Sequence, residues 1–252
     1  MNALAKMTVV EAKMFPRDPG AVAFGVLFPT ILLLGLGAIP MLREPSEDFG
    51  GIRFVEFWAP SALVVGMVAI GAQHVPILIA TYRERGILRR MSTTPVHPGY
   101  LLIAQMIVAL VSVAASALLL VLSAWLILDV APPQHLGTFV LAFFIGYAAV
   151  LAISMISAAL VPSASAATSV GTLIFMALML FGGAFLPRFL MPDVLVTIGE
   201  YVPPGVQAML AAWFPEAAEV TAAGSPRWVQ LGILLGTTVV AGAIAARVFR
   251  WK

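Results

Sequence analysis

The sequence predicts an all-α, polytopic membrane protein with six transmembrane helices, forming a single domain over residues 1–252. Apolar residues make up 61% of the chain and charged residues only 10%, whereas a soluble domain has about 25% charged residues. The apolar residues form long uncharged runs that lack the alternation of barrel strands. Because backbone polar groups in lipid must bond within their own segment, these runs indicate helices.

Five uncharged runs supply the six spans, since a helix needs ~20 apolar residues to cross ~30 Å of hydrocarbon. They cover residues 19–42, 57–82, 91–128, 130–187 and 228–246. The fourth run is long enough for two spans, and a small polar turn at residues 161–168 divides it. We retain the first run as a span because no cleavage site of the A-x-A kind follows it.

Two further segments flank the membrane without crossing it. In residues 1–18, the basic side chains share one helical stripe and the apolar side chains share another, which predicts a helix in the membrane interface. We expect the acids Glu11 and Asp18 to interrupt the apolar face of this helix. Residues 188–226 contain several prolines and apolar pieces too short to span. They predict re-entrant outer helices between spans five and six.

The basic residues fix the orientation of the chain. Ten of the fourteen lysines and arginines lie on one side of the six-span arrangement: Lys6, Lys13, Arg17, Arg83, Arg85, Arg89, Arg90, Arg247, Arg250 and Lys252. Nine of the twelve acids lie on the other side. Since loops rich in lysine and arginine stay in the cytoplasm, we expect both termini to be cytoplasmic, in a bacterial inner membrane.

Several chemistries are missing from the sequence. Lys6, Lys13 and Lys252 are the only lysines and none follows a glycine, so the chain has no Walker motif for ATP. It has no cysteine and no H-E-x-x-H motif, so we expect no bound metal, cofactor or catalytic residue. No acid lies inside a span, which argues against an ion-coupled carrier. An intramembrane enzyme is disfavoured too, because the spans offer no nucleophile paired with a base.

Gln73 and His74 are a polar pair within the second span, and the sequence allows a structural or a functional role for them. An interhelical hydrogen bond that fixes helix packing explains them without any function. The functional interpretation places them on a translocation path. The sequence leaves both interpretations open.

The segment at residues 82–98 reads YRERGILRRMSTTPVHP and lies between two spans. A topology signal would explain its arginines. The pattern from Arg83 to Met91 also suits a short amphipathic helix, in which Arg85 and Arg89 share a face. Prolines 95 and 98 would then end this helix and begin the next span. We interpret the segment as a docking element held nearly free of the membrane, with apolar side chains at Ile87, Leu88 and Met91.

This segment resembles the cytoplasmic motif of type-2 (ABC-2) ABC transporter permeases, especially the drug- and lipid-exporter group. Glu84, Gly86, Leu88, Arg89 and Pro95 would occupy the motif positions. Residues 181–192, FGGAFLPRFLMP, are similar to the family's end of span five. Met91 stands where a second leucine is common. The resemblance implies that the ATPase-coupling residues are Arg83, Glu84, Arg85, Gly86, Ile87, Leu88, Arg89 and Met91.

The resemblance also implies partners. Such permeases work as dimers, with a second copy or a paralogue, and with two ABC ATP-binding subunits that hold ATP-Mg. No nucleic acid is expected. We therefore expect export of a hydrophobic or amphipathic compound, such as a drug, natural product or lipid, since the spans offer no charged site for a polar solute. Export of a polysaccharide or glycolipid is the alternative, and an ion-coupled secondary transporter is a further one.

Overall fold

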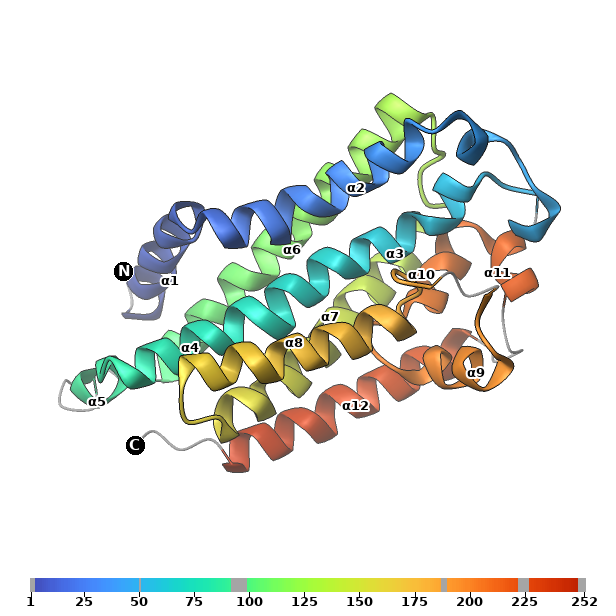
Figure 1. The fold of residues 1–252 in the computed structure, drawn as a ribbon. Coiled ribbons are helices and arrows are strands. Elements are labelled where there is room, and N and C mark those ends of the chain that lie inside the picture. The colour runs from blue at the N-terminus through green and yellow to red at the C-terminus, as the bar shows by residue number, and fades with distance from the viewer. Residues whose placement is uncertain (1–2, 50, 92–98, 187–189, 222–226, 249–252) are drawn as a thin grey trace.

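The computed structural model is an elongated bundle of helices (Figure 1). It describes all residues except 1–2, 50, 92–98, 187–189, 222–226 and 249–252. Among the described residues, β pairing is limited to one isolated bridge between Pro45 and Arg53. The prediction of an all-α protein is therefore confirmed for this part of the chain.

A single long helix forms the centre of the bundle. It consists of α3 (Phe54–Val68), the π-helical turn η5 (Ala69–His74) and α4 (Val75–Glu84). Nearly every side chain of α3 is buried, because α2 (Phe28–Gly37), α6 (Gly99–Leu128), α7 (Leu136–Leu160) and α8 (Ala164–Phe181) pack around this helix. The predicted second span thus lies in the core.

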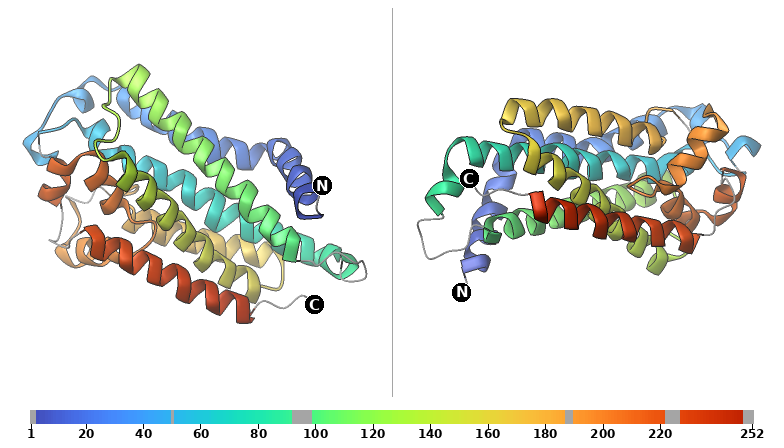
Figure 2. Two further views of the ribbon diagram at one scale, coloured as in Figure 1. Left: turned by 180° about the vertical axis from the view of Figure 1, so that it is seen from behind. Right: turned by 90° about the horizontal axis from the view of Figure 1, so that it is seen from below.

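The outer helices of the bundle bury one side and expose an apolar side. Helix α12 (Arg227–Val248) packs mainly on α7, and the two lie side by side in Figure 2. Leucine, isoleucine and valine side chains remain exposed on α6, α8 and α12, as expected for surfaces that face lipid. The predicted turn between spans four and five is confirmed, because α7 ends at Leu160 and α8 begins at Ala164. The turn is therefore shorter than the predicted residues 161–168.

In the described part of the chain, five helices are long and apolar enough to cross a membrane: α3–η5–α4 taken together, α6, α7, α8 and α12. The amino-terminal segment differs. Helix α1 (Ala3–Met14) and η1 (Phe15–Arg17) meet η2 (Ala21–Leu27) and α2 at a bend of 91°. Counting this bent pair as one span gives six. The Asp18 carboxylate accepts a 3.0 Å hydrogen bond from the Ala21 amide and caps the start of η2.

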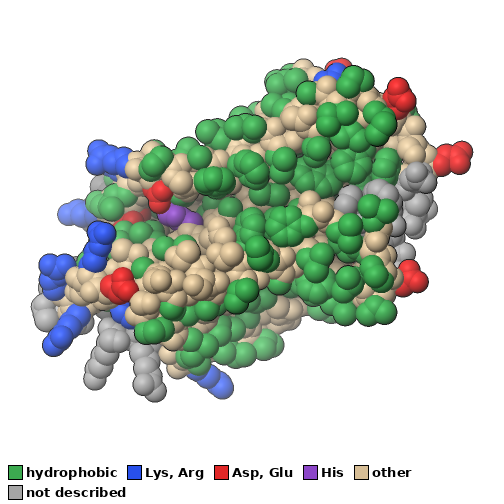
Figure 3. All heavy atoms as spheres, viewed as in Figure 1, with side chains coloured by type: hydrophobic (Ala, Val, Ile, Leu, Met, Phe, Trp, Pro, Cys, Tyr) green, Lys and Arg blue, Asp and Glu red, His purple; other side chains and the backbone are tan. Residues whose placement is uncertain are grey.

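Charged side chains divide the bundle into two ends (Figure 3). Lysine and arginine side chains gather at the end formed by α1, α4, α5 (Ile87–Met91) and the last turn of α12, which we call the basic end. The other end carries η3 (Pro40–Arg43), η4 (Glu47–Phe49) and three short helices. Of these, α9 (Asp193–Tyr201) and α10 (Val206–Trp213) match the predicted apolar pieces, and α11 (Pro215–Thr221) is additional.

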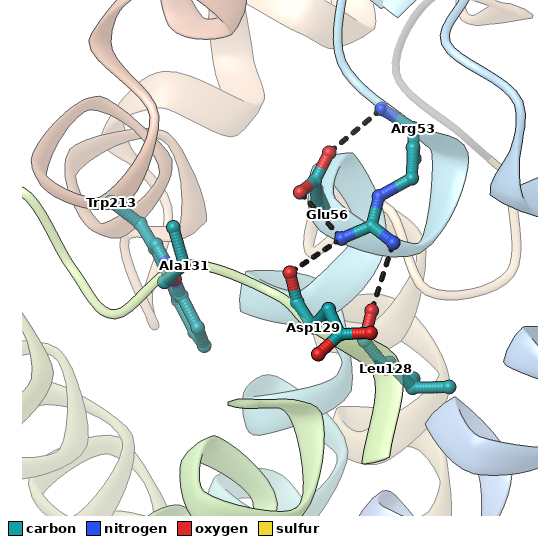
Figure 4. A network of polar contacts seen from close by, with 6 residues as sticks. All are labelled: Arg53, Glu56, Leu128, Asp129, Ala131 and Trp213. Atoms are coloured by element: carbon teal, nitrogen blue, oxygen red, sulfur yellow. Dashed lines mark hydrogen bonds and ion pairs between the residues drawn. The ribbon is translucent and has the colours of Figure 1, made fainter. Parts of the chain in front are cut away.

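A polar network ties the helices together at the end opposite the basic end (Figure 4). The Arg53 guanidinium donates to the carbonyls of Leu128 and Asp129 at 2.8 and 2.9 Å and pairs with Glu56 at 2.8 Å. The Trp213 indole donates to the Ala131 carbonyl at 2.7 Å. One loop after α6 therefore holds the start of α3 and the end of α10.

Candidate functional site

The predicted coupling segment is not one helix. Helix α4 ends at Glu84, Gly86 adopts a left-handed conformation with φ of 66°, and the five-residue helix α5 follows at Ile87–Met91. Glycine is the usual residue at such a helix end because a side chain there strains the backbone. The prediction of a continuous helix from Arg83 to Met91 was wrong, and Arg85 and Arg89 do not share a helical face.

The apolar side chains of α5 face the protein. Leu88 is only 2% exposed and packs with Tyr82 and Leu101, while Ile87 and Met91 lie against the same cluster. These apolar side chains therefore hold α5 against the bundle, and the role of the segment as a docking element stays a prediction. Burying a leucine contributes ~1.5–3 kcal/mol, so this contact fixes α5 to the ends of α4 and α6.

Two charged residues of the segment are bonded to the turn between α7 and α8. The Arg83 guanidinium donates to the Val161 carbonyl at 2.8 Å, and the Glu84 carboxylate accepts from the Ala164 amide at 2.9 Å. Ser163 caps the start of α8 by accepting a hydrogen bond from the Ala166 amide at 3.1 Å. Because a carboxylate is stabilising at a helix N-terminus, Glu84 connects the coupling segment to α8.

The basic residues of the segment provide its outer surface. Arg85, Arg89 and Arg90 are exposed at the basic end, and the Arg90 guanidinium donates to the Arg85 carbonyl at 3.1 Å across the bend. Residues 92–98, including Pro95 and Pro98, lie outside the described residues. The role of all these residues towards an ATP-binding partner stays a prediction.

Gln73 and His74 lie in the π-helical turn η5 and contact different neighbours. The backbone and side chain of Gln73 lie beside Gly171 of α8. The His74 Nδ1 atom is 3.5 Å from the Asp18 carboxylate, and its ring meets the Phe15 ring edge-on with centroids 5.5 Å apart. The pair therefore joins the central helix both to α8 and to the amino-terminal segment. Its place on a translocation path stays a prediction.

Glu11 is the functional candidate that sequence reasoning missed. It is the only buried residue of α1, whereas we expected it to interrupt the apolar face. Its carboxylate accepts hydrogen bonds from the Tyr82 hydroxyl, at 3.0 Å, and from the Gln105 side-chain amide. Burial raises the pKa of the Glu11 carboxyl above its usual range, and these two hydrogen bonds oppose the shift only in part.

A pocket of about 560 Å³ opens beside Glu11 between the amino-terminal segment and the central bundle. Besides Glu11 and the two side chains bonded to it, the lining combines charged, aromatic and apolar side chains: Met14, Phe15, Arg17, Asp18, Pro19, His74, Leu78 and Arg85. Gln105, a single amide in the long apolar helix α6, was the one sequence signal that could have indicated this site. We call this site the polar pocket.

The helical bundle agrees with a comparison of the sequence with known families. The sequence model of the ABC-2 type transporter family matches residues 3–210. No curated protein matches the chain significantly. Because the family match covers most of the chain, this multi-pass membrane protein belongs to the ABC-2 type transporter family, whose permeases associate with ABC ATP-binding subunits.

Proposed function

We propose that the chain is the membrane subunit of an ATP-driven exporter that moves a hydrophobic or amphipathic compound out of the cell. Two ABC ATP-binding subunits would bind ATP-Mg, and a second permease copy or a paralogue would complete the transporter. The chain itself would bind no cofactor and would catalyse no reaction. The family match and the missing Walker motif support this division of roles.

The observation that carries the proposal is the construction of the α4–α5 bend. Arg85, Arg89 and Arg90 are exposed at the basic end, while Leu88 and Glu84 connect the bend to α6 and α8. A partner that binds the exposed outer side of this segment can displace it. The contacts with α6 and α8 can then carry the displacement into the bundle.

The orientation follows from the basic end. We place the basic end in the cytoplasm of a bacterial cell, with six spans, both termini inside, and residues 188–226 dipping into the outer leaflet. The chain has no cysteine, so Ala5→Cys and Glu47→Cys, both at exposed positions at opposite ends, report the topology. An impermeant thiol reagent on intact cells should label only Glu47→Cys. Labelling of Ala5→Cys alone would reverse the orientation.

Reconstitution tests the transport function. The chain and an ABC ATP-binding subunit should together move a fluorescent amphipathic amine across a liposome membrane only when ATP is present, and the compound should stimulate ATP hydrolysis. Stimulation by a lipid-linked polysaccharide instead would support polysaccharide export. Transport by the chain alone, driven by a proton or sodium gradient, would contradict the proposal and favour a secondary transporter.

A further inference from the structure

The polar pocket has an interior and a rim of different chemistry. In its interior, Glu11, Tyr82 and Gln105 are 7%, 8% and 3% exposed, and Tyr82 and Gln105 both donate to the Glu11 carboxylate. Arg17 and Arg85 are exposed at the rim. The interior therefore presents an anion and the rim presents two cations.

The remaining charged groups of the pocket form a pair. The Asp18 side chain, 47% exposed, faces His74 at 3.5 Å, and its other oxygen caps η2. This pair joins the amino-terminal segment to the central helix.

The Glu11 carboxylate has capacity for another donor. A carboxylate offers about four acceptor positions, and Tyr82 and Gln105 supply two donors to Glu11. A primary ammonium group carries three N–H donors in a compact head and would fit the remaining positions. A quaternary ammonium group has no N–H and would not. Guanidinium groups at the rim suit a phosphoryl group, which they bind in a bidentate manner.

The position of the pocket indicates where such a ligand comes from. Helix α1 is bent by 91° from the first span, so it lies across the direction of the bundle when the bundle crosses a membrane. An amphipathic helix in this position lies at the level of the lipid head groups. The pocket between α1 and the ends of the spans is thus placed at head-group depth.

We propose that the polar pocket binds a head group in which a primary ammonium lies next to an anionic phosphoryl group, and that this head group belongs to an aminophospholipid of the surrounding leaflet. The ammonium enters towards Glu11 and the phosphoryl group contacts Arg85 and Arg17. This binding site goes beyond the proposed export function and does not depend on ATP.

Native mass spectrometry of the full chain tests the proposal. The detergent-solubilised protein is exposed to equal amounts of phosphatidylethanolamine, phosphatidylcholine and phosphatidylglycerol, and the retained lipids are counted. Phosphatidylethanolamine should be retained preferentially. Glu11→Gln, which keeps the size of the side chain, should lower that retention about tenfold, because it removes a charge-assisted hydrogen bond. Lys13→Gln on the same helix, outside the pocket lining, should leave it unchanged.

Arg85→Gln tests the contact with the phosphoryl group separately from the contact with the ammonium group. The side chain is exposed, so this variant should fold even if Glu11→Gln does not. It should weaken retention of all three lipids alike, since each of them carries the phosphoryl group. Equal retention of all three lipids by the unaltered chain would overturn the proposal. So would unchanged retention of phosphatidylethanolamine in both pocket variants.

Soluble O-phosphoethanolamine separates the membrane lipid from a free phosphoester. It should displace phosphatidylethanolamine only at concentrations far above those of the lipid, because it lacks the acyl chains that hold the lipid beside the pocket. Displacement at equal concentration, lost in Glu11→Gln, would show that a free phosphoester is the ligand and would contradict the lipid assignment.

Discussion

Replacement of Glu84 by alanine should separate partner binding from transmission. The carboxylate of Glu84 accepts the Ala164 amide at 2.9 Å and so connects the coupling segment to α8. A carboxylate at an exposed helix N-terminus contributes ~0.3–1 kcal/mol. We therefore expect only a small loss of thermal stability, normal membrane insertion and normal co-purification with the ATP-binding subunit.

The functional loss should be larger than the loss of stability. If α8 follows the coupling segment through this bond, losing about 1 kcal/mol of connection should reduce substrate-stimulated ATP hydrolysis roughly fivefold. The assay is hydrolysis by the reconstituted transporter with and without the exported compound. Arg89→Ala, which alters an exposed side chain of α5, should instead weaken association with the ATP-binding subunit.

Ser163→Ala is the matched control for Glu84→Ala. It removes a cap of the same helix but leaves the connection to α4 in place. Its stability cost is ~1 kcal/mol, and hydrolysis should remain coupled to the substrate. Equal uncoupling in Ser163→Ala and Glu84→Ala would show that Glu84 acts only as a helix cap and would refute the reasoning.

Three further variants test the bend, the opposite end and the buried acid. Gly86→Ala should cost about 1–2 kcal/mol in thermal unfolding because φ is 66°, whereas Gly232→Ala, in helix α12 with open space around it, should not destabilise. Arg53→Ala should cost about 2–4 kcal/mol, since it removes two hydrogen bonds from a charged donor to the loop after α6; an unchanged melting temperature would contradict this. Because burial raises the pKa of Glu11 in the folded protein, ionisation of this carboxyl costs more in the folded than in the unfolded chain, and stability should fall as pH rises from the ordinary carboxyl value through the raised one. Glu11→Gln should lose that pH dependence, measured by thermal unfolding in detergent.

The spans could be predicted from the sequence because lipid imposes long uncharged helical runs. The second, third and fifth runs became α3–η5–α4, α6 and α12, and the turn before Ala164 was visible in its small polar residues. The short helix α11 was missed, although Pro215 stands at its first position, a common place for proline.

The sequence around Gly86 contains a signal for the end of a helix, but the helical periodicity of the neighbouring residues favoured a continuous helix. Counting i, i+4 pairs from Arg83 to Met91 gave a continuous helix, but a glycine directly after charged helix-forming residues is also typical of a helix end. The left-handed conformation of Gly86 turned the apolar side chains of α5 back onto Tyr82 and Leu101. Periodicity alone does not say where a short segment ends.

The burial of Glu11 could not be predicted from its neighbours. Its partners Tyr82 and Gln105 are 71 and 94 residues away in the chain, and only the tertiary fold brings their hydroxyl and amide to its carboxylate. The hydrogen bond of Glu84 could not be predicted either, because its partner lies 80 residues away. A charge pattern shows which face of a helix prefers water, and a distant hydrogen-bond donor can reverse that preference.

Site-specific cross-linking tests most directly the central claim that the α4–α5 bend is the contact with an ATP-binding subunit. The Arg89→Cys substitution introduces the only cysteine of the variant chain. A short bifunctional thiol reagent joins it to a cysteine placed in a surface groove of the ATP-binding subunit. We expect a cross-linked product whose yield changes when ATP is added, and no product from Glu47→Cys at the opposite end. Absence of cross-linking at Arg89→Cys in an assembled, ATP-hydrolysing transporter would contradict the account.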